Sequence, residues 1–335
     1  MVEKNTNIDL MRVISAFAVV WLHVSANVVT RHPNVHSNAW WVANTADAYS
    51  RWCVPVFVMI SGALLLSKSN RTTVNNFYKK RMTRILPPLV IWTAIYLIFQ
   101  IFTNSAFGFK YAIMSIIKGM PYYHLWYVYM LLGLYAAAPF ICIFVSNIEQ
   151  RILNKLTFGI LAVSAIESVR MANYFTFLPS FIPFTGYFLA GYNIYNNRMK
   201  YNSYLLIIII IACGFAISTG TGILLPRLGS RSWEIMYSYQ NPFVILMSLC
   251  VFILILGSTR SSRIITGVTN HIAPVSLGIY LIHPLWLWGL SKMGIDGFLG
   301  HPAIGIPFAA IIAFALSAAT TALMAKNSIL KRLVC

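Results

Sequence analysis

The first long apolar run of the chain, residues 7–29, carries three ionisable side chains, Asp9, Arg12 and His23. Ionisable groups are rare inside membrane spans because lipid cannot hydrate them, and where they occur they mark functional sites. Histidine can accept or release a proton near neutral pH, and arginine forms forked hydrogen bonds with phosphate or carboxylate. The run therefore combines a candidate proton acceptor with a candidate anion contact.

Helical spacing places these three side chains on one stripe. Arg12 and His23 are eleven residues apart, which is about 20° past three full turns and roughly 16 Å along a helix axis. Asp9 joins the stripe one turn before Arg12. Such a stripe should face the bundle interior or a water-filled cavity. A structural interpretation is also open, in which Asp9 and Arg12 form an interfacial ion pair and His23 is a hydrogen-bonded bundle histidine.

The composition predicts that a membrane domain must position this stripe. Of the 335 residues, 59% are hydrophobic and 10% charged, and the mean hydropathy is +0.72. Soluble domains are roughly 45–50% apolar and about 25% charged. We therefore predict an all-α, polytopic membrane helix bundle forming a single domain over residues 1–335. The net charge of +18 does not indicate nucleic-acid binding, because the basic residues lie in short loops between apolar runs, as membrane topology requires.

Runs of about 20 apolar residues mark the spans. Ten are predicted: 8–29, 46–67, 84–103, 122–146, 152–170, 179–197, 203–225, 240–258, 271–291 and 302–325. Residues 105–118 look more like an amphipathic helix at the membrane interface. With this topology, 17 of the 25 basic residues fall on the side of the N-terminus and eight on the other side. The positive-inside rule then places both termini in the cytoplasm.

Cysteines and carboxylates are sparse. The five cysteines show no CxxC spacing, and we expect Cys53, Cys142, Cys213 and Cys250 to be buried as small apolar side chains. No histidine, cysteine or carboxylate cluster has the spacing of metal ligands, so the sequence predicts no metal site.

Five stretches together resemble the type 3 membrane acyltransferases. The first is Arg12, ten residues and then His23 within the first span. The others are "SRWCVPVFVMISGALLL" (50–66), "FYKKRMTRILPPL" (77–89) with its Arg-x-x-Arg, "YHLWYVYMLLGLYAAAP" (123–139) and "SLGIYLIHPLW" (276–286). The resemblance covers residues 8 to about 290. The short chain, in which no second catalytic domain follows the bundle, is similar to the members that O-acetylate the enterobacterial common antigen.

The resemblance implies an enzyme of the bacterial inner membrane that takes acetyl from cytoplasmic acetyl-CoA. The acceptor would be a hydroxyl group of a surface polysaccharide or lipid-linked sugar. His23 is then the catalytic base, although a transient acyl-histidine stays open. Arg81 and Arg84, which match the Arg-x-x-Arg, and neighbouring Lys80 would hold the phosphates of coenzyme A. Lys80 is explained more readily as a positive-inside anchor.

Further site residues follow from the same comparison. Arg12 would receive part of the coenzyme A or line its path, and His124 would lie near His23. The aromatic cluster Tyr122, Tyr123, Trp126 and Tyr127 fits an interface belt better than a sugar platform.

Two other polar residues have structural explanations. Arg51 can bind an anionic lipid-linked sugar or, as we favour, pair with Asp47 one turn earlier. His283 precedes Pro284, and a backbone carbonyl freed in a kinked helix can satisfy it.

Other functions remain open at this stage. A transporter or flippase for a glycan or small solute would have the same composition and buried charges. A transferase of another acyl group, such as succinyl, would carry the same motifs. The sequence does not identify the acceptor sugar.

Overall fold

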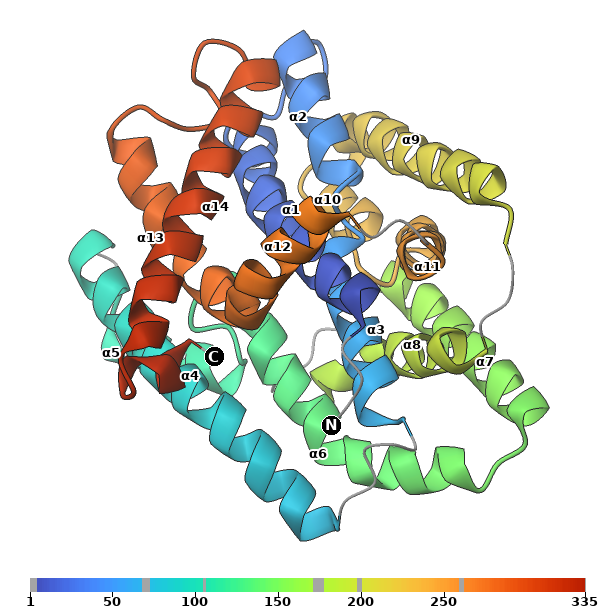
Figure 1. The fold of residues 1–335 in the computed structure, drawn as a ribbon. Coiled ribbons are helices and arrows are strands. Elements are labelled where there is room, and N and C mark those ends of the chain that lie inside the picture. The colour runs from blue at the N-terminus through green and yellow to red at the C-terminus, as the bar shows by residue number, and fades with distance from the viewer. Residues whose placement is uncertain are drawn as a thin grey trace.

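The computed structural model describes residues 5–67, 73–104, 107–170, 178–197, 201–258 and 262–334, and the regular structure within these ranges is entirely helical. The protein is therefore an all-α helix bundle, as predicted (Figure 1). Six basic residues that entered the topology count lie outside the described residues, as does Cys335: Lys4, Lys68, Arg71, Arg198, Lys200 and Arg260.

Helix α1 (Thr6–Arg31) runs through the middle of the bundle (Figure 1). Its N-terminus is capped by Asn5, whose side chain accepts hydrogen bonds from the backbone N–H groups of Asn7 and Ile8. Six other helices pack against it: α2 (Asn38–Ala48), α3 (Cys53–Leu65), α11 (Pro242–Leu256), α12 (Arg263–Ile272), α13 (Ser276–Lys292) and α14 (Pro302–Lys326). The helix with the ionisable stripe is therefore surrounded by protein.

Seven segments in the described ranges are long and apolar enough to cross a membrane, which makes the chain a polytopic membrane protein. They are α1, α2 with α3, α4 (Val74–Thr103), α6 (Trp126–Ser146), α9 (Ser203–Leu228), α12 with α13, and α14. The other three predicted spans correspond to α7 (Gln150–Arg170), to the 3₁₀ helix η2 (Leu178–Phe184) with α8 (Thr185–Asn196), and to α11, which has only 15 residues. The count of ten spans and the cytoplasmic termini stay predictions.

The predicted boundaries were wrong at three spans. The helix expected over 84–103 begins at Val74, because Thr73 caps it and the basic segment continues the same helix. The span expected over 46–67 begins at Asn38 and is broken between α2 and α3. The span expected over 271–291 begins at Arg263 and is divided into α12 and α13 by the 3₁₀ turn η3 (Ala273–Val275). Hydropathy marks the apolar part of a helix and is blind to its polar turns and breaks.

Helices α3 and α8 approach each other closely at two glycines. A β-carbon on Gly62 would lie 1.8 Å from the carbonyl oxygen of Phe188, and one on Gly191 would lie 2.0 Å from that of Met59. Only glycine fits at both positions, as at many membrane helix crossings. The contact fixes the face of α3 that carries Ser61 and Leu64 toward a cavity described below.

The start of α1 and the end of α11 lie at the same end of the bundle. The Asn7 side-chain amide donates to the carbonyl oxygens of Leu256 at 3.0 Å and Ser258 at 2.8 Å. We call this the α1 N-terminal end and the opposite one the α1 C-terminal end. At the latter, α10 (Arg231–Met236) and the residues just after α5 (Phe109–Ile117) line one cavity with Ala26 and Thr30 of α1. Helix α5 falls within the segment expected at the membrane interface.

Candidate active site

Three imidazoles from distant parts of the chain meet beside α1. The ring of His283, on α13, stacks on that of His23 with centroids 5.2 Å apart and planes at 20°. The ring of His124, in the connection before α6, lies edge-on to His283 at 5.4 Å. His23 is half-buried, whereas His124 and His283 are 1% and 0% exposed. Of these three imidazoles, only that of His23 is therefore accessible to water.

Pro284 determines how His283 is held. Proline has no N–H, so the carbonyl of Tyr280, four residues earlier, loses its helical partner. The Nδ1 of His283 lies 2.7 Å from this carbonyl oxygen and 3.3 Å from that of Ile279. Nδ1 must carry the proton to donate to a carbonyl, which leaves Nε2 as an acceptor. This Nε2 has no hydrogen-bond partner among the described residues. The backbone carbonyl contact predicted for His283 is confirmed.

Tyr280 joins α13 to the segment that carries His124. Its hydroxyl donates to the backbone carbonyl of His124, and the Tyr96 hydroxyl donates to the carbonyl of Leu281 at 2.6 Å. Both ring nitrogens of His124 are buried and without a partner in the described part of the chain. The ring nitrogens of His124 and Nε2 of His283 are therefore enclosed by protein, with neither a hydrogen-bond partner in the described ranges nor contact with solvent.

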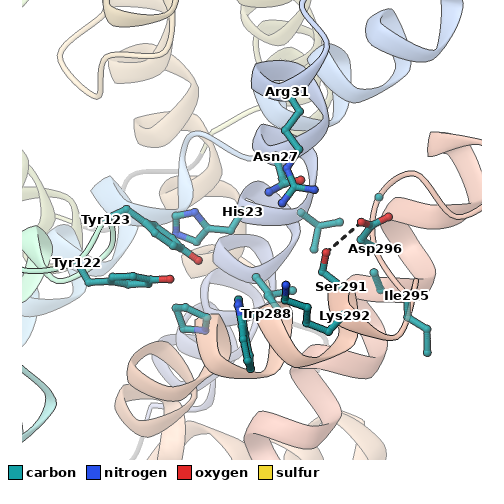
Figure 2. Close-up of a pocket in the computed structure, with 15 residues that line it drawn as sticks. His23, Asn27, Arg31, Tyr122, Tyr123, Trp288, Ser291, Lys292, Ile295 and Asp296 are labelled. Carbon is teal, nitrogen blue, oxygen red and sulfur yellow. Dashed lines mark hydrogen bonds between the residues drawn. The ribbon is translucent and has the colours of Figure 1, made fainter. Parts of the chain in front are cut away.

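A cavity of about 390 Å³ opens beside His23 at the α1 C-terminal end (Figure 2). We call it the histidine cavity. Tyr123 forms one wall, with its ring edge-on to His23 at 4.9 Å. Tyr122, beside Tyr123 in the connection before α6, adds a second ring. The remaining polar and aromatic lining comes from α1, α13 and the turn after α13: Asn27, Arg31, Trp288, Ser291, Lys292 and Asp296.

A second cavity, of about 180 Å³, lies toward the α1 N-terminal end and is lined by Arg12, Arg81 and Arg84. We call it the arginine cavity. Arg12 also forms an ion pair with Asp9, with Nη1 3.0 Å from Oδ1, so the predicted interfacial pair exists alongside the cavity contact. The other walls of the arginine cavity are largely apolar and include Ile85 and Pro88 from α4. Lys80 is exposed and does not line this cavity.

Aromatic residues separate the two cavities. Tyr127 and Tyr280 line the arginine cavity, and their rings are 5.3 Å apart. The Tyr280 ring lies 5.9 Å from that of His283, which in turn stacks on His23. The cavities have no lining residue in common. One layer of aromatic and imidazole side chains thus stands between the arginines and the accessible face of His23.

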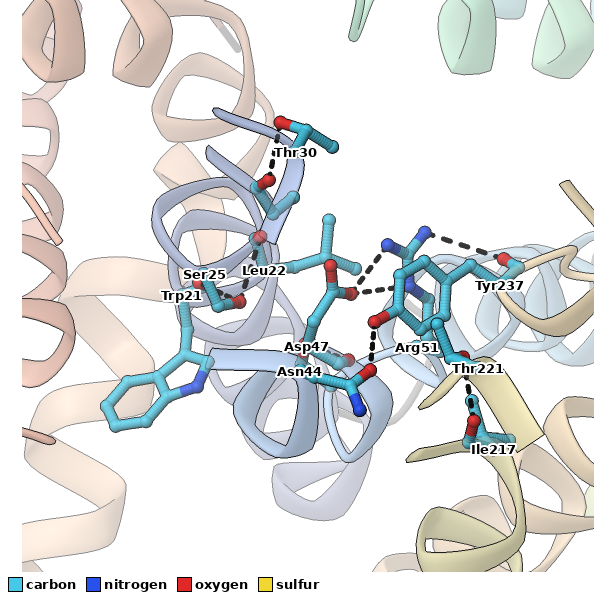
Figure 3. Close-up of polar contacts among 12 residues, drawn as sticks. Trp21, Leu22, Ser25, Thr30, Asn44, Asp47, Arg51, Ile217, Thr221 and Tyr237 are labelled. Atoms are coloured by element: carbon cyan, nitrogen blue, oxygen red, sulfur yellow. Dashed lines mark hydrogen bonds and ion pairs between the residues drawn. The ribbon is translucent and has the colours of Figure 1, made fainter. Parts of the chain in front are cut away.

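A third cavity at the α1 C-terminal end contains Asp47 and Arg51. Arg51 Nη2 lies 2.6 Å from Asp47 Oδ1, with the side chains 12% and 0% exposed, so the predicted ion pair is confirmed (Figure 3). The Arg51 guanidinium also stacks 4.1 Å from the ring centroid of Tyr237. Burial raises the pKa of the Tyr237 phenol, which stays protonated and donates to Asn44 Oδ1. Arg51 is therefore neutralised within the bundle.

A comparison of the sequence with known families identifies the family to which the chain belongs. Residues 5–322 match the family model described as an acyltransferase domain, the type 3 membrane acyltransferases. The chain belongs to this family. No curated protein and no solved structure matches it. The protein is thus a membrane acyltransferase, and its resemblance to the enzymes of the enterobacterial common antigen stays a prediction.

In this acyltransferase the residues predicted from sequence fall into two groups. His23 and His124 lie in the imidazole cluster, and Arg12, Arg81 and Arg84 surround the arginine cavity. Lys80 joins neither group. The predicted aromatic cluster is divided: Tyr122 and Tyr123 line the histidine cavity, Trp126 the third cavity and Tyr127 the arginine cavity.

Sequence reasoning missed the position of His283 in the imidazole cluster. The "YLIHP" segment predicts only the carbonyl contact, because a helix-interior proline leaves a carbonyl free, and it contains no signal for the packing of α13 against α1. Cys53, Cys213 and Cys250 are buried as expected, whereas Cys142 is half-buried and packs against the edge of the core. In the described ranges, no group of three histidine, cysteine or acidic residues is arranged to hold a metal ion.

Proposed function

We propose that this membrane acyltransferase moves acetyl from acetyl-CoA to a hydroxyl group of an extracytoplasmic glycan or lipid-linked sugar. One observation carries the proposal: a cavity with three arginines and a cavity with an accessible histidine flank the same imidazole cluster, along a single helix. The arginine cavity suits the donor and the histidine cavity suits the acceptor.

The arginine cavity has the charge and shape for the donor. Arg12, Arg81 and Arg84 line it without an acidic residue among the other lining positions. Forked guanidinium contacts are the preferred partners of phosphate, and coenzyme A carries phosphates at its nucleotide end. The apolar walls and the tyrosines beyond would receive its thiol arm, which must displace Tyr127 or Tyr280 to reach the cluster.

His23 acts as the general base in this proposal. Its ring nitrogen takes the proton of the acceptor hydroxyl while that oxygen attacks the thioester carbonyl carbon. The carbon–sulfur bond then breaks, and the coenzyme A thiolate leaves and takes up the proton from His23. The product is an O-acetyl ester. His283, stacked on His23, keeps the imidazole turned toward the histidine cavity and acts as a positioning residue.

The side of the membrane follows from charge. The positive-inside rule favours the α1 N-terminal end as the cytoplasmic one, where acetyl-CoA is made. The histidine cavity then opens to the outside of the bacterial inner membrane, where surface glycans are modified. Transfer therefore takes place across the bundle, with no need for the donor to leave the cytoplasm.

Vesicles test the proposal directly. The full chain is reconstituted, [¹⁴C]acetyl-CoA is added outside, and a total extract of bacterial surface glycan and lipid-linked sugar is enclosed. We expect labelled ester on the enclosed glycan, dependent on the protein. Glycan or sugar that leaves the vesicles when acetyl-CoA is omitted, detected by sugar analysis of the external medium, would instead indicate a transporter. Preferential use of succinyl-CoA would change the acyl group, and no transfer with any acyl-CoA would overturn the proposal.

A further inference from the structure

Two cations line the histidine cavity without a carboxylate partner. Arg31 lies in the last turn of α1 and Lys292 in the last turn of α13, and both side chains are exposed. Neither forms an ion pair within the described ranges, where the two pairs found are Asp9–Arg12 and Asp47–Arg51. Figure 2 shows them on the two helices that also supply His23 and Trp288. Two positive charges thus stand at the entrance to the proposed base.

The acidic residue in the lining of this cavity forms its hydrogen bonds within its own turn. Asp296 lines the same cavity, but its carboxylate accepts hydrogen bonds from the Ser291 hydroxyl at 3.2 Å and the Phe298 backbone N–H at 2.9 Å. It orders the turn after α13 and pairs with neither cation. The third cavity differs, because Asp47 neutralises Arg51 there. The lining of the histidine cavity therefore has two cations and one carboxylate, a net charge of +1, whereas Arg51 and Lys118 in the third cavity are balanced by Asp47 and Glu234.

Helix electrostatics alone gives a second explanation. A basic residue in the last turn stabilises the negative end of the helix dipole, by roughly 0.3–1 kcal/mol when exposed. Arg227, in the last turn of α9, has the same helical position but lines none of the three cavities. It is a matched control for the dipole effect without the cavity.

We infer that the acceptor carries an anionic group, a carboxylate or a phosphate, and that Arg31 and Lys292 bind it while the reacting hydroxyl faces His23. The inference rests on the proposed function, because it names the class of acceptor at the same site. Arg31 is eight residues from His23, or about 12 Å along the helix. The charge therefore sits on the sugar ring that reacts or on the adjacent unit.

The rest of the cavity suits a sugar with such a group. Tyr122, Tyr123 and Trp288 offer rings on which a pyranose can lie, and the Lys292 amine is 5.8 Å from the Trp288 ring centroid. The Arg31 guanidinium can make a forked contact with a carboxylate or a phosphate. Because both cations are exposed, they would act mainly on acceptor capture and would be sensitive to salt.

Paired probes with the same sugar configuration, one anionic and one neutral, test the inference. Equilibrium binding of p-nitrophenyl β-D-glucuronide and p-nitrophenyl β-D-glucoside is measured on the purified full chain without acetyl-CoA. α-D-Glucose 1-phosphate against methyl α-D-glucoside forms the phosphate arm. We expect at least one anionic probe to bind roughly tenfold more tightly than its neutral partner at low salt, with the preference shrinking at high salt.

The variants decide where the preference arises. Arg31→Gln and Lys292→Gln should each reduce it about threefold and together abolish it, whereas Arg227→Gln should preserve it. Equal binding of charged and neutral probes by the unmodified protein, including no binding of either, overturns the inference. A preference that survives in the double variant also overturns it. The assay requires no acetyl transfer, so a protein that prefers anionic sugars but transfers no acetyl group would contradict only the proposed function.

Discussion

The imidazole of His283 lies flat against that of His23, with ring centroids 5.2 Å apart and planes at 20°. The two residues are 260 positions apart in the chain and belong to α1 and α13. His283 is fixed by the Tyr280 carbonyl that Pro284 leaves free, so it forms a rigid backing for the half-buried ring of His23. This contact joins the first of the five stretches that resemble the family, Arg12 to His23, to the last, residues 276–286.

Removing the His283 ring should slow the reaction more than it weakens acetyl-CoA binding. His283→Ala lets the His23 ring turn, and misplacing a reacting group by about 1 Å can cost up to roughly a hundredfold. We expect kcat to fall by that order with KM for acetyl-CoA unchanged, in steady-state kinetics. His283→Asn keeps an N–H donor for the Tyr280 carbonyl and should retain more activity. Equal loss in both variants, or a change in KM alone, would contradict a positioning role.

The arginine cavity predicts a graded loss of acetyl-CoA affinity. A hydrogen bond to a charged group contributes about 1.5–3 kcal/mol, so Arg81→Ala or Arg84→Ala should weaken binding roughly tenfold to a hundredfold in calorimetry. The difference in acetyl-CoA affinity between variant and unmodified protein should become smaller as salt rises, because salt screens the phosphate contacts that the variant lacks.

Lys80→Ala is the matched control for this cavity. It removes a positive charge from the same turn of α4, but Lys80 is exposed and lies outside the cavity lining. We expect a change in affinity well below that of the arginine variants. If all three substitutions weakened binding alike, general attraction by a basic surface would explain the result.

The buried Asp47–Arg51 pair predicts a stability effect. Arg51→Met leaves the carboxylate of Asp47 buried and unpaired, which should lower the free energy of unfolding by about 3–5 kcal/mol. The measurement is thermal unfolding in detergent, with exposed Arg231→Gln as the control. Asp47→Leu combined with Arg51→Met removes both charges and should recover much of the loss. A single variant as stable as the unmodified protein would show that the pair is dispensable.

The part of the site on α1 could be predicted from the sequence, because Arg12 and His23 lie on the same helix. Helical spacing alone placed Arg12 and His23 on a common stripe, and the charges predicted both ion pairs, which join residues one turn apart. These inferences need only the geometry of a single helix. The resemblance to the family supplied Arg81, Arg84 and His124.

Contacts between distant helices were beyond such reasoning. The stacking of His283 on His23 depends on how α13 packs against α1, and hydropathy contains no information on that packing. The division of the aromatic cluster among three cavities depends on the same packing. Helix breaks at Tyr49–Trp52 and Ala273–Val275 also escaped detection, because hydropathy averaged over a whole span does not resolve a break of three or four residues.

Acetyl transfer by His23→Gln, measured against acetyl-CoA binding by the same purified variant, tests the central claim most directly. Glutamine has nearly the reach of histidine and can hydrogen-bond but cannot take the hydroxyl proton. The account predicts that donor affinity and melting temperature stay near those of the unmodified protein while transfer falls roughly 10²- to 10⁴-fold. Undiminished transfer would contradict it and would move the proton-accepting step to another residue.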